Sequence, residues 1–76
     1  MTFVAIAPFA WGKGTTADKA VKNAKANLSR SLLEPGKHEI TVYRVAHFTS
    51  VDGLGRIGYK GAIPRKVETR HFIVRR

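Results

Sequence analysis

The fold depends on one amphipathic stretch, ADKAVKNAKANLSRSL, at residues 17–32. Its apolar residues recur at helical spacing and form a single stripe: Ala17, Ala20, Val21, Ala24, Leu28 and Leu32. This spacing predicts one amphipathic helix over the whole stretch. Thr15 or Thr16 before it is a suitable N-cap, and Glu34-Pro35-Gly36 after it contains residues that end helices.

One strand is predicted before this helix. Residues 3–7, FVAIA, are apolar on both alternating faces, which is typical of a central strand. Pro8 limits its length because proline has no N–H to donate to a neighbouring strand. Gly12-Lys13-Gly14 predicts a tight turn into the helix. This turn is either a phosphate cradle, with Lys13 near the free N–H groups of the helix start, or an ordinary capped turn.

Further strands are predicted after the helix. Residues 40–48, ITVYRVAHF, are rich in β-branched and aromatic residues and predict a strand. Arg44 interrupts one of its faces, which is otherwise apolar: Ile40, Val42, Ala46 and Phe48. Asp52-Gly53 predicts a turn, after which strands are expected near residues 56–60 and over residues 67–74.

These elements predict an α+β two-layer fold in the order β-α-β-β-β. One helix would pack on a three- to four-stranded, mainly antiparallel sheet, and residues 1–76 would form a single small domain with residues 75–76 as a flexible tail. The sheet face away from the helix would either display Tyr43, His47, Thr69 and His71 or be buried in a two-fold homodimer.

Residues 14–28, GTTADKAVKNAKANL, resemble the strand exit and helix of HicB-type antitoxins. The resemblance covers under half of the chain. That family places further strands between its first strand and this helix, for which residues 9–16 leave no room. The chain is therefore not assigned to the family.

Charge is the strongest indication of function. The 76 residues contain 14 Lys and Arg against 5 Asp and Glu, a formal net charge of +9. Such self-repulsion does not favour folding, so the excess indicates a polyanionic partner. The absence of cysteine excludes disulfides and thiolate metal sites and suits the cytoplasm, and no segment predicts a membrane span. In size, charge and lack of catalytic motifs, the chain resembles small accessory or regulatory proteins of bacteriophages.

Nucleic acid, either DNA or RNA, is the expected partner, bound mainly through its phosphate backbone. One basic group lies on the predicted helix, and another lies in the C-terminal segment, where aromatic residues are interspersed. The expected contact residues are Lys13, Lys19, Lys22, Lys25, Arg65, Lys66, Arg70, Arg75 and Arg76.

The alternative is a protein–protein interaction module that docks on, and inhibits or regulates, an acidic host protein. Its interface residues would be Phe9, Trp11, Phe48 and Leu54. An exposed apolar patch encircled by basic residues would favour this alternative, whereas burial of these side chains would favour nucleic acid. Membrane binding is not expected, because the apolar stripe of the helix is mostly alanine.

No residue constellation predicts an enzyme, a cofactor or a metal site. The residue types of a small metal-free ribonuclease are present, since His38, His47 and His71 accompany Tyr43 and Tyr59. Their spacing does not indicate that they form one acid–base site, and it is not typical of metal ligands. A ribonuclease is the enzymatic alternative to a binding protein.

Overall fold

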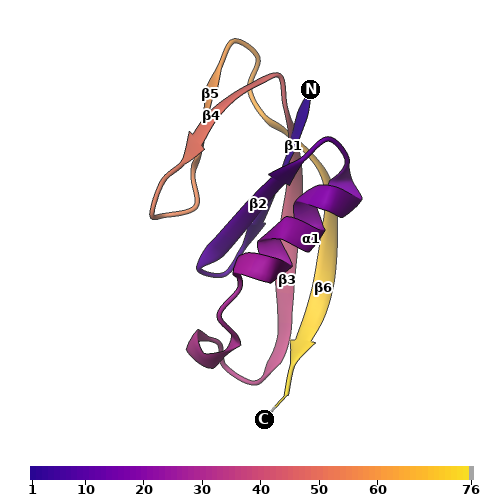
Figure 1. Ribbon diagram of the computed structural model, residues 1–76, viewed down its shortest axis with the longest axis vertical. Coiled ribbons are helices and arrows are strands. Elements are labelled where there is room, and N and C mark those ends of the chain that lie inside the picture. Colours follow the sequence, from indigo (N-terminus) through magenta and orange to yellow (C-terminus); the bar gives the residue numbers. More distant parts are fainter. Residues whose placement is uncertain (76) are drawn as a thin grey trace.

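The computed structural model describes residues 1–75, and of Arg30 it describes the backbone alone. One helix lies across a four-stranded antiparallel sheet, and a separate two-stranded hairpin extends from that sheet (Figure 1). The larger sheet has the strand order β2-β1-β3-β6, and the hairpin pairs β4 with β5. The elements are β1 (Thr2–Ala7), β2 (Ala10–Gly14), α1 (Ala17–Asn27), a 3-10 turn (Arg30–Leu32), β3 (Gly36–Val45), β4 (His47–Val51), β5 (Ile57–Lys60) and β6 (Arg65–Val74).

The α+β prediction of one helix on a mainly antiparallel sheet is confirmed, but the predicted order lacked β2. The chain reverses at Pro8 and Phe9, and β2 then pairs with β1. Pro-Phe is not a recognised hairpin signal, which explains why the sequence did not reveal this turn. The statement that residues 9–16 leave no room for a strand was therefore wrong.

Gly12 and Gly14 belong to strand β2, so the predicted tight turn at this point is also wrong. They face α1, which packs directly on the strand backbone. A Cβ at Gly12 would lie 2.2 Å from the backbone nitrogen of Ala24, and a Cβ at Gly14 would lie 2.7 Å from the Lys19 Cβ. These glycines thus permit close approach of the helix rather than a change of chain direction.

Helix α1 begins as predicted and ends earlier than predicted. The Thr16 hydroxyl caps it by accepting from the Lys19 N–H at 3.2 Å. The helix stops at Asn27, where Leu28 takes an extended conformation, rather than continuing through residue 32. The Asn27 amide instead donates to the Trp11 carbonyl at 3.0 Å, so it holds the helix end on the outer edge of β2.

The core lies between α1 and the sheet. Its buried side chains come from the helix, from the central strands and from β6: Ala5, Ala7, Ala20, Val21, Ala24, Leu33, Ile40, Val42, Phe72 and Val74. In β3, alternate side chains point to opposite faces of the sheet, and the apolar residues Ile40 and Val42 lie on the face that α1 covers. Within the described chain, no helix has the length and apolar character needed to cross a bilayer.

The β4–β5 hairpin covers part of the sheet face that α1 leaves open. The strand predicted over residues 40–48 breaks after Val45, so Phe48 belongs to the hairpin and not to the apolar face of β3. The ring centres of Phe48 and Trp11 are 5.7 Å apart, and the Trp11 side chain points away from the helix. Val4 and Val45, on the same face, are fully buried. Of the four residues expected on this face, Tyr43 and Thr69 are half-buried and His71 is exposed, whereas His47 belongs to β4 of the hairpin, so its predicted place on the sheet was wrong.

Candidate functional site

The half-buried Arg70 is paired with two carboxylates. Its guanidinium pairs with Asp18 of α1, and its Nε lies 2.8 Å from a Glu68 oxygen. The hydrogen bonds that Arg70 donates to Glu68, and secondly to Asp18, raise the pKa of Arg70 above its ordinary value. This triad ties the first turn of α1 to β6, so Arg70 has a structural partner on each side and little freedom to bind a ligand.

Two other carboxylates are likewise engaged within the chain. Asp52 Oδ2 lies 2.9 Å from Arg56 Nε, and Asp52 Oδ1 accepts hydrogen bonds from the backbone N–H groups of Leu54 and Arg56. The Arg56 N–H contributes most to holding the pKa of Asp52 below its ordinary value. Glu39 lies 3.2 Å from the His71 ring. Four of the five carboxylates therefore serve contacts within the fold.

Most of the cations have no such partner. Apart from Arg56 and Arg70, every Lys and Arg side chain that the structure describes is exposed and forms no ion pair with a carboxylate. These residues are Lys13, Lys19, Lys22, Lys25, Lys37, Arg44, Lys60, Arg65, Lys66 and Arg75. Most of the described cations therefore face solvent without a carboxylate partner, whereas four of the five carboxylates form ion pairs within the chain.

Three of these cations form one surface on α1, here called the helix basic surface: Lys19, Lys22 and Lys25. They are three residues apart along the helix, so their side chains are neighbours on its exposed side. The buried stripe of α1 faces the sheet on the opposite side, through Ala20, Val21 and Ala24. Amphipathic spacing predicted this arrangement.

The register of the sheet brings two arginines to the same side of the molecule as the helix basic surface. Gly14, Phe3, Arg44 and Arg65 are successive cross-strand partners in β2, β1, β3 and β6. Residues paired in this way share one face of an antiparallel sheet. Because Gly14 lies beneath Lys19, this row begins under the helix and ends at the two arginines. Arg44 was not among the predicted contact residues, although its interruption of an apolar face was visible in the sequence.

The other predicted contact residues lie elsewhere. Lys13 is on the opposite sheet face, where its Nζ lies 5.4 Å from the centre of the Phe48 ring. Lys66 pairs with Tyr43 and therefore also faces away from α1. Arg75 follows β6 at the end of the sheet far from Arg65, and Arg76 lies outside the described residues. The structure therefore does not gather all predicted contact residues into one site.

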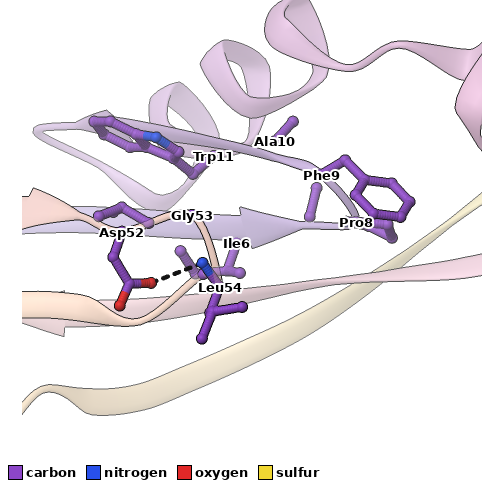
Figure 2. A pocket seen from close by; sticks show the side chains of 11 residues that line it. Ile6, Pro8, Phe9, Ala10, Trp11, Asp52, Gly53 and Leu54 are labelled. Carbon is purple, nitrogen blue, oxygen red and sulfur yellow. Dashed lines mark hydrogen bonds between the residues drawn. The ribbon is translucent and has the colours of Figure 1, made fainter.

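Three of the four residues of the protein-interface alternative, Phe9, Trp11 and Leu54, line a second feature, here called the apolar pocket. It is a cavity of about 630 Å³ between the β1–β2 turn, which carries Phe9, and the β4–β5 turn, which carries Leu54 (Figure 2). Phe9 and Leu54 are each 79% exposed, whereas Trp11 and Phe48 are half-buried and touch each other. No Lys or Arg lines the pocket, and Asp52 does. Among the described unpaired cations, Lys13 lies next to Phe48, and none lines the pocket.

The three histidines lie in three different parts of the structure. His38 Nε2 lies 2.7 Å from the Glu34 carbonyl oxygen and its ring stacks on Phe72, while His71 contacts Glu39 on the other sheet face. His47 pairs with Lys60 in the β4–β5 hairpin. Over residues 1–75, no three His, Asp or Glu side chains gather in a way that would hold a metal ion.

Comparisons of the chain with protein families, with curated proteins and with solved structures find no match.

Proposed function

We propose that this protein binds nucleic acid through the phosphate backbone. The helix basic surface and the nearby ends of β3 and β6 would contact the phosphates. The observation that supports the proposal is the division of charge: four of the five carboxylates form ion pairs within the fold, while ten of the described Lys and Arg side chains are exposed and have no carboxylate partner. Lysines and arginines of this kind can replace the counterions of a nucleic acid, and the released counterions drive binding.

The test is a salt titration of a triple variant, Lys19→Gln with Lys22→Gln and Lys25→Gln. If all three lysines contact duplex phosphates, the slope of log affinity against log salt becomes shallower by about 2 to 3 units. The control is Lys37→Gln with Lys60→Gln, since both lysines are exposed, lack carboxylate partners and lie away from α1. An equal slope change per charge in both variants would show that only net charge matters and would contradict the proposed surface.

The apolar pocket supports a second candidate function, binding of a protein partner. Phe9 is exposed and has a φ of 59°, a backbone conformation that bulky residues rarely adopt. Such a conformation costs free energy without any packing gain within the chain, which is typical of residues kept for binding. Leu54 offers a second exposed apolar side chain across the same cavity.

This second candidate is tested with the variant Phe9→Ser with Leu54→Ser. A protein partner that uses the apolar pocket will bind the wild type and the triple lysine variant but not the serine variant. Equal binding by all three proteins would remove the pocket from the interface.

A further inference from the structure

Arg44 and Arg65 form an unusual pair. They lie directly opposite each other in β3 and β6, and both are exposed. Neither is paired with a carboxylate. Like charges directly opposite on neighbouring strands destabilise a sheet, so this cross-strand pairing of two arginines costs stability. An anion bound between them would relieve that repulsion.

A cavity of about 230 Å³ lies at this pair. Its lining contains Arg44 and Arg65 and no carboxylate. The other lining residues have apolar side chains: Met1, Ala46, Ala62 and Ile63. Ile63 and Met1 are exposed, so the cavity has an apolar rim that is open to solvent. Such a lining suits an anionic group attached to a less polar body, rather than a fully hydrated ion alone.

The chemistry of arginine narrows the class of ligand. Each guanidinium presents parallel N–H donors that match two oxygens of a phosphate or carboxylate. Two guanidinium groups on adjacent strands can therefore share one tetrahedral anion between them. The same row of cross-strand partners leads from this pair to Lys19 of the helix basic surface, so an extended polyanion could pass over both.

We propose that Arg44 and Arg65 together bind one phosphate group of a nucleic-acid backbone, and that the adjoining sugar rests on Met1 and Ile63. This assignment rests on the proposed function. It adds Arg44 to the contact residues and gives the β3–β6 end of the surface a defined phosphate position.

The test uses inorganic phosphate and a duplex oligonucleotide as separate probes. The variant Arg44→Gln with Arg65→Gln is compared with the charge-matched control Lys37→Gln with Lys60→Gln. Thermal unfolding is followed in phosphate and in chloride of equal ionic strength, because a ligand that binds only the folded state raises Tm. We expect phosphate to raise the Tm of the wild type and of the control above the chloride value, and to lose this extra effect in the arginine variant.

For the duplex, the arginine variant should bind about tenfold or more weakly at physiological salt, since it loses charge-assisted hydrogen bonds. The control should lose less. In chloride, the arginine variant should be no less stable than the wild type because the repulsion is gone. If it does not fold, Arg44→Lys with Arg65→Lys keeps the charges, removes the forked geometry and should still weaken the phosphate effect.

The outcomes separate the two claims. Equal behaviour of the arginine variant and the control with both probes overturns the phosphate site. A phosphate effect that depends on both arginines, in a wild-type protein that does not bind the duplex, supports the site as an anion site and overturns the nucleic-acid assignment.

Discussion

Gly12→Ala tests how closely α1 is seated on β2. The new Cβ would lie 2.2 Å from the Ala24 nitrogen, 2.6 Å from the Asn23 carbonyl carbon and 2.8 Å from the Ala20 carbonyl oxygen. All three atoms belong to the helix backbone, so no side chain can rotate away. The helix must move by about 1 Å to restore ordinary contact, and overpacking of this kind costs about 1 to 3 kcal/mol, with the backbone clash placing it near the upper value.

This loss is large for a chain of 76 residues. A domain of that size is expected to have a free energy of unfolding of about 4 to 11 kcal/mol. With an m-value of about 1 kcal/mol/M, the urea midpoint should fall by about 2 to 3 M, measured by far-ultraviolet circular dichroism. Gly53→Ala is the control because no heavy atom lies within 4 Å of its Cβ position. A Gly12→Ala midpoint equal to that of Gly53→Ala would refute the close helix–strand packing.

Two further predictions concern the turns that border the apolar pocket. Because the pKa of Asp52 is lowered in the fold, its carboxylate stabilises the β4–β5 turn above pH 3.8, and this contribution disappears as pH falls below 3.8 through the lowered value. The Leu54 and Arg56 amide resonances should shift with this titration in the wild type and not in Asp52→Asn. A titration midpoint above pH 3.8 would contradict the hydrogen bonds from these two N–H groups to Asp52. Phe9→Asn should raise the free energy of unfolding, measured by urea titration, by about 0.5 to 1 kcal/mol, because asparagine tolerates positive φ and the Phe9 side chain that is lost is exposed. A decrease in the free energy of unfolding would show that Phe9 packs within the chain.

The start of helix α1 and the main part of strand β3 were predictable because their patterns are local. The Thr16 cap and the β-branched run of β3 each act within a few residues, and both are present in the structure. Strand β2 was missed because the reason for its glycines is tertiary: the helix lies against them. The last helical residue also makes a tertiary contact that the local pattern does not reveal, since the Asn27 side chain donates to the Trp11 carbonyl of β2.

The candidate site was only partly predictable for the same reason. Helical spacing was sufficient to group Lys19, Lys22 and Lys25. The neighbours Arg44 and Arg65 are far apart in the sequence, and only the β3–β6 register brings them together. Arg70 looked equivalent to the other cations until its contacts with Asp18 and Glu68 were known.

Binding of nucleic acid is the central claim, and the most direct test is fluorescence anisotropy of labelled duplex DNA, single-stranded DNA and RNA titrated with the wild-type protein over a range of salt concentrations. The predicted result is binding of at least one form at physiological salt, with log affinity falling by about 0.7 to 0.9 per log unit of salt for each phosphate contacted. No binding at low salt, or an affinity that does not change with salt, would contradict the claim and leave the apolar pocket as the better basis for function.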